Sequence, residues 1–257
     1  MITGLGYAFT GGREPKRVIG RAAASFLYRL ALRRSDLIIF LNPDDRALFR
    51  QLGLVPTDKD AKILNGEGLD IDYFSPAPLP SGTAFLMIAR LLKDKGIREF
   101  AEAAKRLKAA HPDVPVMLVG PFYPSPDSLR QSELDELIRC GVDYKGAMTD
   151  VRPAIAASSV YVLPSYREGT PRSVLEAMAM GRAIITSDAP GCRETVIDGE
   201  NGLLVRPRDA DSLYEAMIRF VEEPGLAASM GEASRRIAEA KYDVRKINST
   251  LLGYAGL

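Results

Sequence analysis

The sequence predicts an α/β fold built on a parallel sheet that is covered by helices on both faces. Short runs rich in apolar and β-branched residues alternate with amphipathic segments of helix length from residue 84 onward, a pattern typical of strand–helix–strand units. The 257-residue chain is 46% hydrophobic and 26% charged, as in ordinary globular proteins, so it can bury a large core. Together these observations predict one complete, doubly wound, Rossmann-like domain.

The elements of this domain follow one another in a regular order. The strand candidates are residues 84–89, 115–120, 142–146, 160–164, 183–187 and 202–205. The helix candidates between them are residues 97–110, 127–140, 151–158 and 171–180, and two or three more helices follow residue 209. Because parallel strands need long crossover connections, this order places all the strands in a single sheet.

Upstream of this domain the sequence predicts a second, smaller Rossmann-like piece. It contains a helix at 15–34, a strand at 37–41, a helix at 44–52 and a strand at 62–64. So few strands leave an open sheet edge. We therefore expect residues 1–74 to be the C-terminal remnant of a larger, truncated domain.

A proline-rich segment separates the two parts. Prolines at 76, 78 and 80 remove backbone donors and fix the backbone, so residues 75–82 are predicted to be a linker. The complete domain then occupies residues 83–236, and a C-terminal helix at 237–257 is expected to pack back toward the N-terminal piece.

Bulk properties favour a cytoplasmic protein without a nucleic-acid partner. The net charge of +1 gives no support for nucleic-acid binding. Cys140 and Cys192 lie far apart and lack the spacing of metal ligands, as expected of lone thiols in a reducing compartment. The longest apolar runs have the length of strands, and the N-terminus lacks the pattern of a secretion signal.

The clearest chemical pattern lies between residues 165 and 181. The strand at 160–164 leads into a loop, after which Thr170 is the predicted N-cap and Pro171 the first residue of a helix that Gly181 ends in a left-handed conformation. A helix that begins at the carboxyl end of a parallel strand is a common anion-binding site. The pattern therefore predicts an anionic ligand at this position.

Two glutamates flank this helix start. Glu168 precedes the helix, and Glu176 lies within it, about 9 Å further along the axis than the helix start. A nucleoside diphosphate across the helix start would meet one carboxylate at each end, and a carboxylate can accept hydrogen bonds from a vicinal diol. The alternative interpretation is a loop charge and a solvated helix face, since glutamates at this spacing are common.

A second group of charges follows the strand at 84–89. Arg90 and Lys95 flank a strand-to-helix turn at the same edge of the sheet, where two cations can neutralise a pyrophosphate leaving group without a metal. A solvated charge cluster is the alternative. Basic residues at a helix start oppose the helix dipole, which favours a bound anion.

The order of these motifs resembles glycosyltransferase family 4, whose members have the two-Rossmann-domain GT-B fold. The matching motifs are Ile88-Ala89-Arg90-Leu91 with Lys95-Gly96, Pro164-Ser165, Glu168-Gly169, Glu176-Ala177, Gly181, Asn65-Gly66 with Phe74-Ser75-Pro76, and residues 198–205. The resemblance is good over residues 62–205.

The resemblance implies a retaining hexosyl or N-acetylhexosaminyl transferase that uses a nucleotide sugar, with a UDP-sugar favoured, and needs no metal or other cofactor. It assigns Arg90 and Lys95 to the donor diphosphate, Glu168 to the transferred sugar and Glu176 to the ribose hydroxyls. Backbone amides near sugar or phosphate are assigned to Gly169 and Thr170, and to residues 190–194, which include Gly191 and Cys192.

The acceptor is indicated by the first residues. Residues 2–9 resemble bacterial members that extend undecaprenyl-diphosphate-linked sugars in surface-polysaccharide synthesis, which implies a glycan or lipid-linked acceptor. The segment from Arg13 to Arg34 holds seven basic residues against Glu14 alone. This segment fits either a helix on the anionic inner face of the membrane or a solvated helix face.

Two other functions compete with this interpretation. Because half of the first domain is expected to be missing, the chain could be a truncated, non-catalytic fragment that binds nucleotide sugars. A nicotinamide-dependent dehydrogenase is disfavoured, because Phe9 occupies the third glycine position of the dinucleotide fingerprint.

Overall fold

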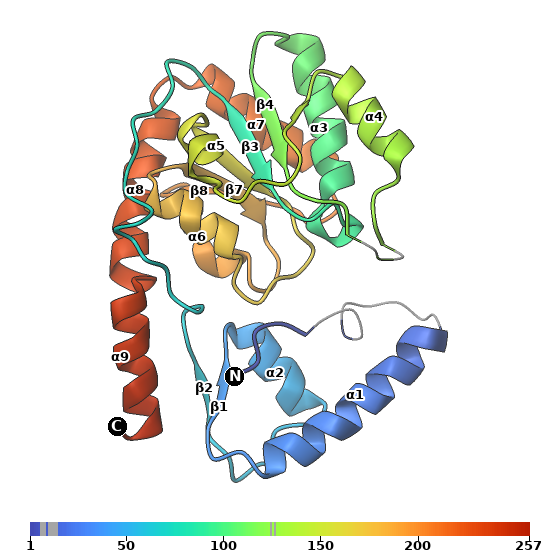
Figure 1. Ribbon diagram of the computed structural model, residues 1–257, viewed down its shortest axis with the longest axis vertical. Helices are drawn as coiled ribbons and strands as arrows, with labels where there is room; N and C mark the ends of the chain where they lie inside the picture. Colours follow the sequence, from blue (N-terminus) through green and yellow to red (C-terminus); the bar gives the residue numbers. More distant parts are fainter. Residues whose placement is uncertain (6–8, 10–14, 124, 126) are drawn as a thin grey trace.

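The computed structural model describes residues 1–5, 9, 15–123, 125 and 127–257, with side chains of the first helix described from Ile19 onward. Gly6, Tyr7 and Ala8 of the predicted acceptor motif, and Arg13, Lys16 and Arg17 of the basic segment, lie outside the described residues or side chains. The chain forms a large and a small α/β unit that face each other, joined along one side by the C-terminal helices (Figure 1).

The large unit contains a six-stranded, fully parallel sheet in the order β5-β4-β3-β6-β7-β8. Its strands are β3 (Phe85–Ile88), β4 (Val116–Val119), β5 (Asp143–Tyr144), β6 (Val160–Leu163), β7 (Ala183–Ser187) and β8 (Gly202–Val205). The order reverses between β3 and β6, where open parallel sheets bind their ligands. The predicted α/β fold with a doubly wound sheet is confirmed.

Helices cover this sheet with apolar faces at helical spacing. They are α3 (Ile97–Ala110), α4 (Gln131–Arg139), α5 (Arg152–Ala156), α6 (Arg172–Ala179), α7 (Ala210–Glu222) and α8 (Leu226–Lys241), with short 3-10 turns η1 (Lys93–Lys95) and η2 (Arg193–Thr195). α3 packs against α7, and α6 packs against α8. β4, β6 and β7 are buried along their whole length, and β3 is buried except at Ile88, so a large core cluster lies in this unit.

The small unit contains α1 (Pro15–Arg33), β1 (Ile38–Phe40), α2 (Pro43–Gln51) and β2 (Ala61–Ile63). β1 and β2 pair in parallel, and Ile2 forms a parallel bridge to Phe40 on the other side of β1. The aromatic rings of Phe9, Tyr28, Phe40 and Phe49 cluster beneath these strands with centroids 4.9 to 6.1 Å apart.

Two arginines hold the segment that connects the units. The predicted linker at 75–82 contains no helix or strand. Arg182, which is fully buried, donates hydrogen bonds to the carbonyl oxygens of Ala77 and Pro78. Arg235 donates to the carbonyl oxygen of Phe74. Because buried guanidinium groups need several acceptors, these contacts fix the path of the connection.

The C-terminal helices join the two units. The predicted domain boundary after residue 236 is wrong, because α8 continues without a break to Lys241. The following helix, α9 (Val244–Ala255), packs through Ile247 on the small unit, and the hydroxyl of Tyr254 donates to the carbonyl oxygen of Ile63 at 3.1 Å. α8 and α9 therefore lie along one side of the molecule and span both units (Figure 1).

Candidate functional site

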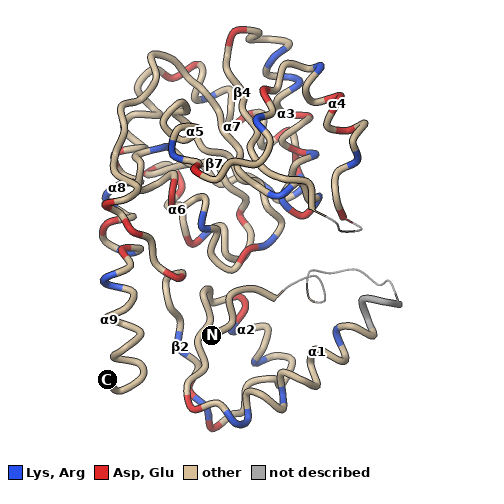
Figure 2. Tube along the Cα trace, viewed as in Figure 1, with Lys and Arg blue, Asp and Glu red and all other residues tan. Residues whose placement is uncertain are grey.

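Two adjacent cavities open at the carboxyl ends of β3 and β6, and both are lined by Arg90, Lys95 and Glu168. One cavity, of about 440 Å³, lies between the units and is also lined by Thr3, Gly4 and Leu5 of the small unit. The other, of about 310 Å³, lies at the start of α6 and is also lined by Pro171, Arg172, Ser173 and Glu176. We call them the inter-unit cavity and the α6 cavity. Figure 2 shows residues of both charge signs along this edge of the large unit.

The start of α6 differs from the prediction. Pro171 is the N-cap, without a side-chain capping bond, and Thr170 instead donates its hydroxyl across the units to the carbonyl oxygen of Leu41 at 3.4 Å. The predicted capping role of Thr170 is therefore wrong. The end of the helix is as predicted, since Gly181 has a φ of +79°. The first residues of α6 line the α6 cavity, so its positive dipole end faces this space.

Glu176 lies about one turn into α6 and lines the α6 cavity but not the inter-unit cavity. Its side chain is 12% exposed, and the Nε of Arg172 lies 3.1 Å from its Oε1. Burial raises the pKa of Glu176, and the neighbouring Arg172 opposes this shift. A largely buried carboxylate that lines a cavity is suited to accept hydrogen bonds from hydroxyl groups of a ligand.

Glu168 and Lys95 form an ion pair, with 2.5 Å between the Nζ of Lys95 and the Oε1 of Glu168. Both side chains are about 85% buried, at 15% and 14% exposure. Gly96 makes this approach possible, because its φ is +71° and a Cβ there would lie 2.1 Å from the carbonyl oxygen of Pro164. The resemblance assigned Lys95 to the donor diphosphate and Glu168 to the transferred sugar, whereas in this structure the two side chains pair with each other.

Arg90 is exposed and lies over the ring of Tyr123, with 4.7 Å between its guanidinium carbon and the ring centroid. It lines both cavities together with Lys95, so the two predicted cations do meet in one cleft. The guanidinium keeps its charge and its donors while stacked on an aromatic face. Two cations and a helix N-terminus therefore surround the α6 cavity.

The remaining predicted residues build the loops around this cleft. Gly169 lines the inter-unit cavity, and a Cβ on it would lie 1.8 Å from the carbonyl oxygen of Thr3. Gly191 has a φ of +81° and packs against the carbonyl oxygen of Glu168. Cys192 is fully buried, its amide donates to the carbonyl oxygen of Ala189, and burial raises the pKa of its thiol. Neither cavity is lined by Thr170, Gly191 or Cys192.

Sequence reasoning missed several residues of the cleft. Arg167, Tyr123 and Asp94 also line the inter-unit cavity. Burial raises the pKa of Asp94, and its Oδ1 lacks a hydrogen-bond partner among the described residues. The position of Asp94, between two lysines in the turn that carries Lys95, was the signal available in the sequence.

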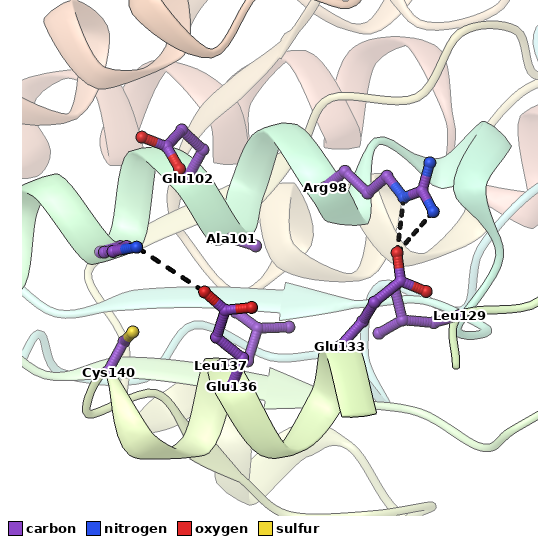
Figure 3. Close-up of a pocket in the computed structure, with 9 residues that line it drawn as sticks. Arg98, Ala101, Glu102, Leu129, Glu133, Glu136, Leu137 and Cys140 are labelled. Carbon is purple, nitrogen blue, oxygen red and sulfur yellow. Dashed lines mark hydrogen bonds and ion pairs between the residues drawn. The ribbon is translucent and has the colours of Figure 1, made fainter. Parts of the chain in front are cut away.

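A third cavity, of about 180 Å³, lies between α3 and α4 and is shown in Figure 3. Arg98 and Glu133 form an ion pair across it, and so do Lys105 and Glu136. Its lining has no residue in common with the two cavities of the cleft. Its shape and ion pairs are those of a seam between two packed helices.

Comparisons with known proteins agree with the resemblance. The family model described as "Glycosyl transferases group 1" matches residues 76–237. The chain is 31% identical to N,N'-diacetylbacillosaminyl-diphospho-undecaprenol alpha-1,3-N-acetylgalactosaminyltransferase of Campylobacter jejuni, over 95% of this chain and 66% of that protein. It is 26% identical to UDP-Gal:alpha-D-GlcNAc-diphosphoundecaprenol alpha-1,3-galactosyltransferase of Escherichia coli, over 95% of this chain and 65% of that protein. The chain thus spans just under two thirds of the length of these relatives.

Solved structures show the same fold. HepE of Anabaena, in complex with UDP, superposes with a TM-score of 0.82 at 22% identity, over 95% of this chain and 70% of that chain. Sucrose-phosphate synthase of Thermosynechococcus elongatus superposes with a TM-score of 0.78 at 26% identity, over 90% of this chain and 60% of that chain. Because the family model covers more than half of its length, the chain belongs to the glycosyl transferases group 1 family.

Proposed function

We propose that this chain binds a nucleotide sugar, a UDP-sugar in the favoured case, and transfers the sugar to a glycan or to an undecaprenyl-diphosphate-linked acceptor in surface-polysaccharide synthesis. The observation that carries the proposal is the pair of cavities that share Arg90, Lys95 and Glu168 beside the start of α6. The names of the Campylobacter jejuni and Escherichia coli relatives, which both act on diphospho-undecaprenol sugars, support the acceptor class.

The donor is proposed to lie along the start of α6. The ribose hydroxyls face Glu176 in the α6 cavity, and the diphosphate lies between the helix N-terminus and the cations Arg90 and Lys95. The sugar then reaches Glu168, which lines both cavities. The acceptor hydroxyl enters from the inter-unit cavity, on the side of the small unit.

The reaction proposed here is a group transfer with retention of configuration. The bond between the anomeric carbon and the diphosphate oxygen breaks, a bond to the acceptor oxygen forms, and the proton of the acceptor hydroxyl passes to the departing diphosphate. Negative charge grows on the departing diphosphate, and preorganised cations and helix dipoles stabilise such charge. Arg90, Lys95 and the start of α6 take this role in the proposal, so nucleotide binding should not depend on a divalent metal ion. The transferred group is proposed to be a hexose or an N-acetylhexosamine.

α1 is proposed to rest on an anionic membrane surface. Large apolar side chains of α1 are strongly exposed: Ile19 at 70%, Phe26 at 59%, Leu27 at 64% and Leu30 at 44%. Exposed arginines accompany them at Arg21, Arg33 and Arg34. Exposed apolar residues beside cations are typical of helices that lie in a lipid interface. Every helix among the described residues is too short or too polar to cross a bilayer.

Vesicle sedimentation tests this membrane contact. We expect the chain to sediment with vesicles that contain phosphatidylglycerol and not with phosphatidylcholine vesicles, and we expect Phe26→Ser/Leu27→Ser to abolish sedimentation. Equal sedimentation of the wild type with both vesicle types would contradict the electrostatic part of the proposal.

Calorimetric titration tests the donor site. UDP, GDP, ADP and NAD are titrated separately into the chain, in EDTA and again with magnesium. We expect UDP to bind most tightly, with the same affinity in both buffers, and NAD not to bind. Binding of NAD alone, or the absence of binding by all three nucleoside diphosphates, would overturn the proposal. Transfer is tested with UDP-galactose and UDP-N-acetylgalactosamine and a polyprenyl-diphosphate sugar as acceptor.

A further inference from the structure

The turn between β1 and α2 of the small unit contacts both loops that surround Glu168. We call residues 41–45, which include the first three residues of α2, the β1–α2 turn. Its side chains and backbone bond to the loop after β6, at Arg167, Glu168, Gly169 and Thr170, and to Arg193 in the loop after β7. The proposed sugar-binding residue is therefore held by the unit opposite to the one that carries it.

Asn42 is the centre of this contact and is fully buried. Its Oδ1 accepts a hydrogen bond from the amide of Asp45 at 2.8 Å and caps α2. Its Nδ2 donates to the carbonyl oxygen of Gly169 at 2.9 Å and to that of Glu168 at 3.3 Å. The side-chain amide offers an acceptor for the cap and two N–H donors for the two carbonyl oxygens of the opposite loop.

Two ion pairs accompany Asn42 in the β1–α2 turn. Asp45 is 1% exposed and accepts hydrogen bonds from the guanidinium of Arg167, which donates through Nε at 3.1 Å and also through Nη2. Burial raises the pKa of Asp45, and Arg167 opposes this shift. Asp44 accepts from Arg193 at 2.8 Å. Because the buried pair has lost most of its water, separating its partners is unfavourable.

These contacts leave Glu168 little freedom. Its amide donates to the carbonyl oxygen of Pro190 at 2.9 Å, its own carbonyl oxygen accepts from Asn42, and its carboxylate is paired with Lys95. The neighbouring Gly169 packs directly on the backbone of Thr3. The small unit thus contacts the backbone on both sides of the peptide bond between Glu168 and Gly169.

We propose that Asn42 and Asp45 are positioning residues, which hold the Glu168 loop so that the Glu168 carboxylate reaches the donor sugar. This inference rests on the proposed function. It means that recognition of the sugar depends on contact between the two units, whereas recognition of the nucleotide depends on the large unit alone. A donor sugar and a closed arrangement of the units would then stabilise each other.

Asn42→Asp tests the proposal sharply. Aspartate caps helices as well as asparagine does, so α2 keeps its N-cap, but a carboxylate oxygen replaces the Nδ2 donor in front of two carbonyl oxygens. Asn248→Asp is the matched control, because Asn248 is exposed on α9. Asp45→Asn is the second variant, since it removes the charge partner of Arg167 without touching the cap.

Each variant is titrated with UDP and with whichever of UDP-galactose and UDP-N-acetylgalactosamine the wild type binds more tightly. For Asn42→Asp and Asp45→Asn we expect UDP affinity within about twofold of wild type and a loss of roughly tenfold in the preference for the UDP-sugar. Amide exchange of residues 165–170, measured without ligand, should become at least about tenfold faster in both variants. Asn248→Asp should match the wild type in both measurements.

Two results would overturn the positioning role while the proposed function stands. One is an equal loss of UDP and UDP-sugar affinity, which a purely structural contact would give. The other is unchanged amide exchange at residues 165–170 in both variants. A wild-type chain that binds neither ligand would instead refute the proposed function itself.

Discussion

Replacing Glu168 by glutamine should change the affinities for UDP and for a UDP-sugar in opposite directions. In the structure Lys95 is paired with Glu168 at 2.5 Å, so the charge of Lys95 is shared before any diphosphate arrives. Glu168→Gln keeps the volume of the side chain and removes its negative charge. Lys95 is then free to pair with the diphosphate, and a repulsion between Glu168 and the diphosphate disappears.

The size of each effect follows from the burial of the pair. At about 6 Å and an effective dielectric constant of about 20, the repulsion between the Glu168 carboxylate and one phosphate charge is roughly 3 kcal/mol. Solvent and salt in the open cleft reduce this repulsion to about 1 kcal/mol. UDP should therefore bind about fivefold more tightly. The sugar loses a charge-assisted hydrogen bond worth about 1.5–3 kcal/mol, so the preference for UDP-sugar over UDP should fall at least about tenfold.

Calorimetric titration of wild type and Glu168→Gln with both ligands measures these changes. Glu215→Gln is the matched control, because Glu215 is exposed on α7 and lines neither cavity. Loss of UDP and UDP-sugar affinity by the same factor would refute the reasoning. It would mean that the ion pair supports the loop and does not face the sugar.

Three further predictions follow from other parts of the structure. Glu176→Gln should weaken the binding of UDP and of the UDP-sugar equally, by about tenfold, because both ligands lose a charge-assisted hydrogen bond to the ribose. Unchanged UDP affinity in calorimetric titration would exclude the ribose contact. Glu133→Gln should lower the free energy of unfolding by about 1 kcal/mol at neutral pH. Burial raises the pKa of Glu133, but hydrogen bonds from Arg130 and Arg98 outweigh it and lower the pKa to about 2 from 4.5. The ionised Glu133 carboxylate therefore stabilises the fold fully above pH 4.5, and this stabilisation is lost as the pH falls from 4.5 to 2. In urea unfolding experiments, the difference in free energy of unfolding between wild type and Glu133→Gln should disappear over that range. A difference that stays constant with pH would contradict the ion-pair explanation. Gly169→Ala should lower the free energy of unfolding by more than about 2 kcal/mol, since the added Cβ would lie 1.8 Å from the carbonyl oxygen of Thr3. A thermal melt identical to that of the wild type would show that the units can separate freely at this point.

The strands and helices of the large unit could be predicted because their signals are local. Strands such as β7 and helices such as α3 have the predicted bounds, since apolar periodicity and flanking breakers mark both ends. The boundary after residue 236 failed because no local signal separates residues 237–241 from the rest of α8.

The site was harder to predict, because its contacts join distant parts of the chain. Lys95 and Glu168 are 73 positions apart, and no spacing rule pairs them. Thr170 has the residue type of an N-cap, but its hydroxyl bonds to Leu41, 129 positions away, so tertiary contact overrides the local preference. Asn42 caps α2 one residue before Pro43, whereas the helix was predicted to begin at Asp44, and its bond to Gly169 depends on the packing of the units.

A crystal structure of the chain with UDP bound tests the proposed donor site most directly. We predict that the ribose hydroxyls lie within hydrogen-bond distance of the Glu176 carboxylate and that the diphosphate lies between the start of α6, Arg90 and Lys95. The Lys95–Glu168 pair should lengthen as Lys95 turns toward the phosphate. UDP bound in the seam between α3 and α4, or in the cleft with its ribose at Glu168, would contradict the placement from which the proposed function is argued.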